Sequence, residues 1–286
     1  MNSKFNEVVI AAAVRTPIGT FKGSLKNIKA DQLGSIVIKE VINRANINSK
    51  DIDEVILGQV LTAGSGQNPA RQASINAGLP KSIPAYLVNQ VCGSGLRSVI
   101  LGFQTIKLNE AKYIISGGQE NMSIIPHTLF YRNENKLSED KLTDTMTHDG
   151  LIDAFKKYHM GITAENIAEK LNISRKEQDN FALKSQNKTQ LALKQNKFKD
   201  ELISVNLDGS FLNSDEHPRK DLRAEDLEKL KSAFKENGTV TAGNASGIND
   251  GAAAVLLTTL NEAEKKSLKP LVKIVSWSSV GVEPSL

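Results

Sequence analysis

Strand-like and helix-like stretches alternate through the first 118 residues, and this order restricts the chain to few folds. Four apolar runs typical of buried strands are separated by three segments in which apolar residues recur at helical spacing. The strand-like runs are 7–14, 54–61, 85–91 and 111–118, and the helix-like segments are 31–46, 68–77 and 93–109. Because strands joined through helices run in the same direction, the order predicts an α/β fold with a parallel sheet that helices cover on both faces.

The alternation stops at residue 119. Residues 119–160 are polar and irregular, and a loop of that length inside a compact domain is rarely without a function. Further helices are predicted at 163–171, after the capping box S-R-K-E at 174–177, and at 222–234. Alternation returns with a strand at 251–258, a helix at 261–267 and a strand-like run at 270–277. We therefore expect the middle of the chain to be an insertion in a layered domain.

Composition and charge argue against several classes of function. Lys and Arg are scattered among Asp and Glu, the net charge is only +4, and aromatic residues make up 5% of the chain. Such a surface is not typical of a nucleic-acid-binding protein. No stretch approaches the roughly 18 apolar residues that cross a membrane. The apolar run 8–14 follows Glu7 and leads into Arg15, which favours a strand over a signal peptide. We expect a soluble, cytoplasmic protein.

The single cysteine, Cys92, lies in N-Q-V-C-G-S-G-L-R-S, where a predicted strand gives way to a predicted helix. It rules out an internal disulfide and a cysteine-based zinc site, and no metal site is predicted. A sharp turn between strand and helix would lift the thiol out of the sheet. Gly93 and Gly95 are expected to permit that turn, because glycine adopts backbone angles that other residues resist.

The helix after Cys92 gives the thiol two possible interpretations. An apolar stripe is expected to fasten this helix to the core; it consists of Leu96, Val99, Ile100 and Phe103. The N–H groups of the first turn and the helix dipole favour a thiolate, and they can hold a developing oxyanion. A buried, inert thiol is the other interpretation, since free cysteine is among the most buried residue types.

Five motifs then occur in the order typical of one family. The Cys92 segment closely resembles the nucleophile segment of the thiolases, which make or cleave β-ketoacyl-CoA thioesters. Four more segments are similar to thiolase signatures: A-A-V-R-T-P-I-G-T-F (12–21), G-Q-N-P-A-R-Q-A (66–73), Y-H-M-G-I-T-A-E-N (158–166) and T-A-G-N-A-S-G-I-N-D-G-A-A-A (241–254). The stretch from G-G-Q-E-N-M-S (117–123) to Y-H-M-G also resembles the tetramerisation loop of bacterial acetoacetyl-CoA thiolases.

This resemblance implies a fold, a set of domains and a set of site residues. The fold would be the layered α-β-α arrangement of the thiolases, with the N-terminal α/β domain in residues 1–118 and 248–268 and a CoA-binding loop domain in 119–247. Cys92 would be the acyl-accepting nucleophile. The residues implied to line the CoA arm are Leu151, His159, Met160, Arg219, Ala242, Gly243 and Ser246. From the residues alone, each assignment has an alternative: Met160 as a core residue, Arg219 as a solvated surface charge, and His159 in the structural role that is more common for a lone histidine.

The activity that the resemblance implies is that of an acetyl-CoA C-acetyltransferase. Two acetyl-CoA molecules would condense to acetoacetyl-CoA and CoA, or the reverse, through an acetyl-cysteine. Coenzyme A would be a substrate, with no permanently bound cofactor. The family also implies a homodimer or homotetramer. Related ketosynthases do not share Y-H-M-G or T-A-G-N-A-S-G.

The printed sequence departs from the family pattern at its end. Thiolases carry an N-E-A-F asparagine, a G-H-P histidine and a C-x-G cysteine further along, and none of these motifs occurs here. We therefore expect residues 269–286 to begin a second α/β half that is largely missing, and the 286-residue chain alone to be weakly active or inactive. The alternative is a non-catalytic CoA-binding fragment, or one half of a split enzyme whose partner is a separate C-terminal half.

Overall fold

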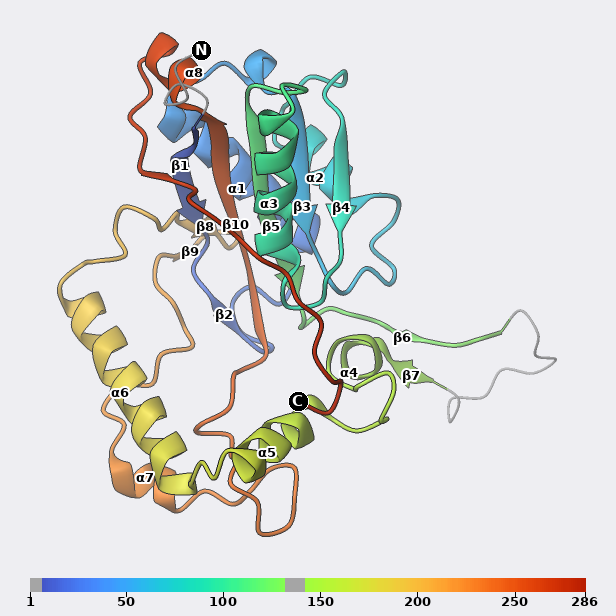
Figure 1. Cartoon of the computed structure of the whole chain (residues 1–286), viewed down its shortest axis with the longest axis vertical. Coiled ribbons are helices and arrows are strands. Elements are labelled where there is room, and N and C mark those ends of the chain that lie inside the picture. The colour runs from blue at the N-terminus through green and yellow to red at the C-terminus, as the bar shows by residue number, and fades with distance from the viewer. Residues whose placement is uncertain (1–6, 132–141) are drawn as a thin grey trace.

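A computed structural model describes residues 7–131 and 142–286 (Figure 1). Its α/β body is built on a seven-stranded sheet, in the order β11-β1-β10-β5-β3-β4, with β2 paired to β10. The strands are β1 (Val8–Arg15), β2 (Gly19–Thr20), β3 (Glu54–Gly58), β4 (Ala85–Val88), β5 (Ile114–Asn121), β10 (Asn249–Thr259) and β11 (Val272–Lys273). The predicted α/β class is confirmed, although β5 runs past residue 118, where the expected domain boundary lay.

The sheet is mixed, so the prediction of a parallel sheet was wrong. β3 is parallel to β4 and to β5, whereas β10 is antiparallel to both β1 and β5. The reason is the long excursion between β5 and β10. The chain leaves the sheet at the end of β5 and re-enters at the same end in β10, so β10 must run in the opposite direction.

Helices lie on both faces of this sheet, as predicted. On one face are α1 (Ala30–Ala45) and α2 (Pro69–Asn76), and on the other is α3 (Ser94–Lys107) (Figure 1). The larger core cluster lies under α1, where Leu33, Val37 and Val41 are fully buried at helical spacing. A smaller cluster under α3 contains Ile56, Ile106, Ile114 and Leu257. The body also includes the short 3-10 turn Ser49–Asp51 and α8 (Leu260–Lys265).

Between β5 and β10 the chain forms a more open set of helices and short strands. Its helices are α4 (Thr145–Gly150), α5 (Met160–Lys170), α6 (Arg175–Lys194) and α7 (Ala224–Glu228). Its strand pairs are β6 (His127–Thr128) with β7 (Thr143–Asp144), and β8 (Val205–Asn206) with β9 (Phe211–Leu212). The predicted capping box is present at the start of α6, where Ser174 and Glu177 bond each other's backbone N–H. Residues 132–141 of the predicted tetramerisation loop lie outside the described residues.

Two predicted elements are much shorter in the structure. The helix expected over 222–234 is only the five residues of α7. Arg175 of α6 donates to the carbonyl oxygens of Leu227 and Leu230, which a longer helix would use for its own hydrogen bonds, so α7 ends at Glu228. The strand expected over 270–277 is reduced to the two residues of β11, which are exposed. Beyond β11 the chain is extended along α3: Trp277 lies 5.8 Å from the Arg97 guanidinium, and Ser285 accepts a hydrogen bond from Asn166.

Candidate functional site

Cys92 lies on a sharp turn between β4 and α3. The turn depends on Val91, whose φ of 48° is in the left-handed region that a β-branched residue rarely occupies. Its backbone is fixed on both sides: Val91 N donates to Asn89 Oδ1 (2.8 Å), and Val91 O accepts from Ser94 Oγ (2.6 Å). The prediction that glycines make this turn was wrong. Gly93 has ordinary helical angles, φ −84° and ψ −4°.

The first turn of α3 is seated on the sheet through small residues. A Cβ atom on Gly58 would stand 2.5 Å from Gly95 N, and Ser98 Oγ donates to Gly117 O of β5 (2.7 Å) while it accepts from Gly117 N (2.9 Å). The predicted apolar stripe was therefore only partly right. Ile100 is buried, but Leu96 is 68% exposed. Serines and glycines, rather than that stripe, fasten the head of the helix that carries Cys92.

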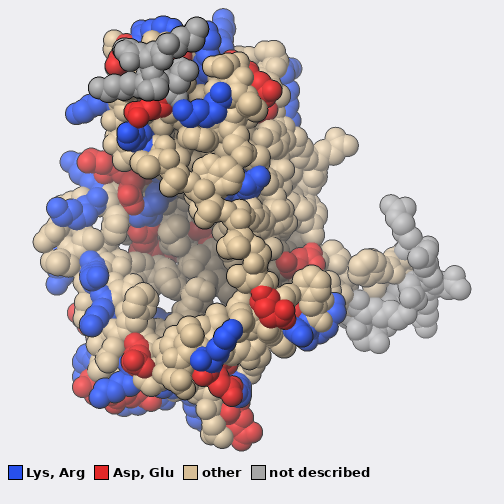
Figure 2. All heavy atoms as spheres, viewed as in Figure 1, with Lys and Arg blue, Asp and Glu red and all other residues tan. Residues whose placement is uncertain are grey.

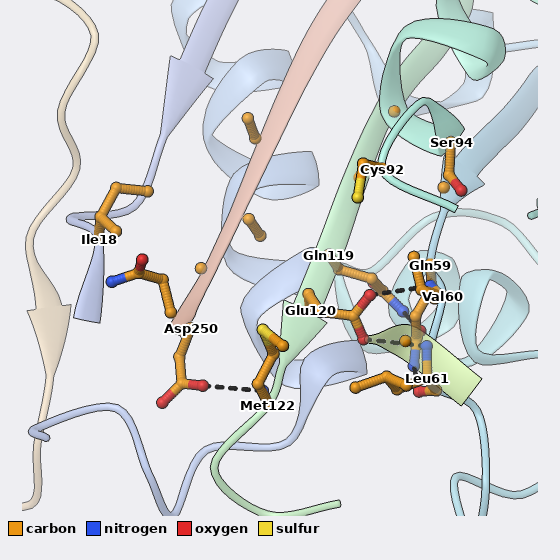
Figure 3. A pocket seen from close by; sticks show the side chains of 18 of the residues that line it. Ile18, Gln59, Val60, Leu61, Cys92, Ser94, Gln119, Glu120, Met122 and Asp250 are labelled. Atoms are coloured by element: carbon orange, nitrogen blue, oxygen red, sulfur yellow. Dashed lines mark hydrogen bonds between the residues drawn. The ribbon is translucent and has the colours of Figure 1, made fainter. Parts of the chain in front are cut away.

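A cavity of about 440 Å³ opens beside the thiol. Cys92 is exposed, and its Sγ points into this cavity (Figure 3). Apolar side chains make most of the wall, among them Ile18, Val60, Leu61, Met122 and Leu151. Among the seven residues expected to bind CoA, only Leu151 shares this cavity with Cys92. The thiol is exposed and faces an apolar cavity, so it is not the buried thiol of the alternative interpretation.

Two carboxyl groups at the cavity were missed by the sequence reasoning. Glu120 accepts from Val60 N (2.8 Å) and Leu61 N (3.3 Å), which ties the chain after β3 to β5. Burial raises the pKa of Glu120 to about 7, despite those two hydrogen bonds. Asp250 accepts from Met122 N (Figure 3) and also from Ser123 N, and burial raises its pKa also. The motif G-G-Q-E-N contained Glu120, but its environment depends on packing between distant segments.

The structure gathers three of the expected CoA-binding residues around the start of α5. Met160 N donates to Leu151 O (2.8 Å), so these two lie together. His159 caps the helix, since its Nδ1 accepts from Gly161 N (3.0 Å), and its ring stacks on Phe234 at 4.6 Å between centroids. His159 thus has a structural role here. Phe234 had not been predicted, and no sequence signal marked it.

The other four expected residues form a second group near α7. Arg219 is exposed, and its Nη2 donates to Ala242 O (2.9 Å). Gly243 packs against Leu227 and Leu230, where a Cβ atom would stand 2.5 Å from a Leu227 methyl carbon. Ser246 is exposed. The two groups are connected indirectly: His159 stacks on Phe234, and the neighbouring Ala233 N donates to Val240 O (2.9 Å), two residues before Ala242.

Charge on the outer surface is mixed. In Figure 2, Lys and Arg lie among Asp and Glu without a large area of one sign on the face shown, and the surface is hollowed between the α/β body and the helices below it. Within the described residues, no helix combines the length and the apolar character needed to cross a membrane.

The fold and this site together define a class of protein: an α/β protein that presents an exposed cysteine at a strand-to-helix turn. The sequence matches the family "Thiolase, N-terminal domain" over residues 8–261, which is most of the chain. The chain belongs to the thiolase family, and by family it is an acyl-transferring enzyme.

Individual relatives agree with this assignment. The acetyl-CoA acetyltransferase of Paracoccus denitrificans is 50% identical over 284 residues, an alignment that covers 98% of this chain and 73% of the relative. The cytosolic acetyl-CoA acetyltransferase of Rattus norvegicus is 47% identical, with 100% of this chain and 74% of the relative covered. The crystal structure of the Bacillus anthracis acetyl-CoA acetyltransferase superposes with a TM-score of 0.93 at 38% identity, covering 98% and 72%.

These comparisons confirm the predicted family and its α/β fold. The chain spans about three quarters of the length of the relatives, for example 73% of the Paracoccus protein. They give no support to a missing second half, to inactivity, or to a separate C-terminal half as partner. The roles of individual site residues stay predictions.

Proposed function

We propose that this chain accepts the acyl group of an acyl-CoA thioester on Cys92. The Sγ thiolate attacks the thioester carbonyl carbon, a new C–S bond forms, and the bond to the CoA sulfur breaks. CoA leaves as its thiol with the proton that Cys92 gave up. The observation that carries the proposal is the orientation of Cys92 Sγ into the cavity at the head of α3, in a chain similar to several acetyl-CoA acetyltransferases.

The acyl group is proposed to be acetyl, and the reaction to be the condensation of two acetyl-CoA molecules to acetoacetyl-CoA or its reverse. Coenzyme A then enters as substrate. Its pantetheine arm would leave the cavity past Leu151 and follow His159 and Met160, with Ala242, Gly243, Ser246 and Arg219 further along. This path is supported by the place of Leu151 in the cavity wall, and by the contact of His159 with Phe234 beside the Ala233–Val240 backbone pair that leads to Ala242. An exposed guanidinium suits a nucleotide phosphate.

Release of CoA tests the acylation step. Mixing the purified chain with acetyl-CoA is expected to release one equivalent of CoA per Cys92, and Cys92→Ala is expected to release none. The chain has one cysteine, so a burst that persists in Cys92→Ala would contradict the proposal. Thr239→Ser is a control variant that keeps the hydroxyl at a residue outside the cavity lining, and it should keep the burst.

The 286-residue polypeptide by itself is proposed to stop at the acyl-cysteine. Its sequence contains neither a second cysteine nor a G-H-P histidine, which the family uses for proton transfer. Loss of members of one catalytic unit typically lowers kcat by a factor of about 10³ or more. Steady-state thiolysis of acetoacetyl-CoA by this polypeptide, with more than one turnover per Cys92, would refute the proposal.

Assembly and organisation are proposed on separate observations. Beside the β6-β7 pair, which projects from the body in Figure 1, Phe130 is 83% exposed and Tyr131 and Leu142 are 46% exposed. Such a face suits a homodimer or homotetramer, which light scattering of the purified chain would detect. We further propose residues 1–118 with 248–268 as one domain, 119–247 as a CoA-binding domain, 269–286 as the start of another, and a cytoplasmic location.

A further inference from the structure

The motif A-A-V-R-T-P-I-G-T-F has no assigned role in the acylation step, yet its arginine is at the centre of a strong contact. Arg15, the last residue of β1, binds Asp215 with both terminal nitrogens: Nη1 to Oδ1 at 2.7 Å and Nη2 to Oδ2 at 3.0 Å. Its Nε donates to Glu201 Oε1 at 2.6 Å. The Arg15 and Asp215 side chains are only 18% and 8% exposed. Paired bonds between a guanidinium and a carboxylate are strong and fix geometry.

Arg15 and Asp215 each stabilise the charged form of the other. Burial opposes both charged forms, but the mutual hydrogen bonds outweigh it, so the pKa of Asp215 is lowered and the pKa of Arg15 is raised. The backbone takes part as well: Arg15 N donates to Glu201 O (2.8 Å), and Arg15 O accepts from Ile203 N (3.0 Å). Removing one member would leave the other charged and buried.

Asp215 and its neighbour Glu216 join the 213–221 segment to the chain that follows β1. Asp215 Oδ1 accepts from Ile18 N (2.8 Å), and Glu216 Oε2 accepts from Thr20 N (3.1 Å). Glu216 also accepts from Ser24 Oγ, and its own N–H donates to Ile18 O (3.0 Å). Two segments about 200 residues apart are therefore fastened along several residues.

The next residue reaches the wall of the cavity. The His217 ring lies directly against Gly247, where a Cβ atom would stand 2.3 Å from His217 Cε1. Gly247 and Asn249 line the cavity that receives Cys92 Sγ, and Asn249 Nδ2 donates to Gly19 O (2.9 Å). Arg15 is itself among the residues that line this cavity, and a continuous set of contacts also runs from it through Asp215 and His217 to the wall at Gly247.

We propose that Arg15 is a positioning residue for acyl-CoA: its ion pair with Asp215 holds His217 against Gly247 and so sets the cavity wall that the thioester must pass. The inference rests on the proposed acylation of Cys92. Arg15 then affects the binding of acyl-CoA and leaves the chemistry of the Cys92 thiol unchanged. Arg15→Gln should weaken the capture of CoA-bearing reagents and leave the reactivity of Cys92 toward a small reagent unchanged.

The test compares two alkylating agents on the full chain. In both reactions Cys92 Sγ displaces a halide from carbon, and the thiol proton goes to buffer. Bromoacetyl-CoA reports binding through the concentration that gives half-maximal inactivation, and iodoacetamide reports the thiol alone. For Arg15→Gln we expect that concentration to rise about tenfold or more, since small displacements at a site can cost about a hundredfold. The iodoacetamide rate should stay within about twofold, the range of neutral substitutions.

Further variants make the result decisive. Arg223→Gln, which breaks an exposed pair with Asp226 away from the cavity lining, should match the wild type with both reagents. Asp215, unlike Arg15, is not among the residues that line the cavity, so Asp215→Asn separates positioning from direct contact. It should reproduce the Arg15→Gln effect, and it carries the test if Arg15→Gln loses its folded circular dichroism. Wild-type half-saturation in the folded variants would overturn the inference. Failure of the proposed function would look different, because the wild-type chain itself would then show no saturation with bromoacetyl-CoA.

Discussion

Gly58 of β3 lies in direct contact with Ser94 at the head of α3: a Cβ atom on Gly58 would stand 2.4 Å from the Ser94 carbonyl carbon. Both partners in this contact are backbone, so neither can move aside without moving the helix. The turn that bears Cys92 immediately precedes Ser94. The position of the thiol over the cavity therefore depends on the absence of a side chain at residue 58.

Gly58→Ala is expected to displace the first turn of α3 and to lower the free energy of unfolding by about 1–3 kcal/mol, the usual cost of overpacking. The CoA burst should fall with it. Urea unfolding and the burst assay measure the two effects. Gly281→Ala is the matched control, because nothing lies within 4 Å of a Cβ atom there. Equal stability of the two variants would mean that this contact does not hold the helix.

Val91→Gly is expected to raise the free energy of unfolding by about 1 kcal/mol. Relief of a left-handed conformation is worth about 1–2 kcal/mol, and the added freedom of glycine in the unfolded chain removes about 0.5–1 kcal/mol. Ile124→Gly is the control, since Ile124 is similarly exposed (44% against 49%) and is not among the residues with positive φ. It should be destabilised. Equal losses of stability in both variants would argue against strain at Val91.

The raised pKa of Glu120 predicts that the folded chain loses stability as pH rises. Its pKa in the folded chain, about 7, lies above the ordinary value of 4.5, so the folded state holds the proton more tightly than the unfolded state. The free energy of unfolding should therefore fall between pH 4.5 and about 7, by at most about 1.4 kcal/mol per pH unit, and level off above. Asp250, whose pKa is also raised, acts in the same direction.

Unfolding measured from pH 4.5 to 8 in the wild type and in Glu120→Gln isolates this contribution. The difference between the two stabilities should change with pH only in the window named. A difference that does not vary with pH would show that Glu120 titrates normally in the folded chain.

Glu165 supports the T-A-G-N-A-S-G arm from α5. It is 4% exposed, and its carboxylate accepts from Thr239 N (2.8 Å), Thr239 Oγ1 (2.9 Å) and Val240 N (2.7 Å). Glu165→Gln leaves buried donors without an acceptor and should cost about 1–3 kcal/mol in urea unfolding. Glu169→Gln, one turn along and paired with the exposed Lys235, should change stability by less than about 1 kcal/mol. The reverse order of the two effects would contradict this role.

Sequence reasoning was most successful where the signal is local. The apolar spacing of α1 and the capping box of α6 depend on neighbouring residues, and both were predicted at nearly the right positions. The place of Cys92 between strand and helix was also predicted from nearby residues. Its turn was assigned to Gly93, because no propensity favours a β-branched residue such as Val91 in the left-handed region.

The remaining errors concern contacts between distant segments. The direction of β10 depends on where the chain returns after the excursion from β5, which no strand pattern encodes. The raised pKa of Glu120 depends on burial by segments far away in sequence. The pair of Arg15 and Asp215, 200 residues apart, could not be inferred from either residue's neighbours.

The most direct test of the account is to locate the acetyl group after reaction with acetyl-CoA. The chain is quenched in acid during the burst, digested, and its peptides are examined by mass spectrometry. The account predicts one acetyl group on the peptide that contains Cys92, and none on that peptide in Cys92→Ala. A folded wild-type chain that carries no acetyl group on Cys92, or carries it on another residue, would contradict it.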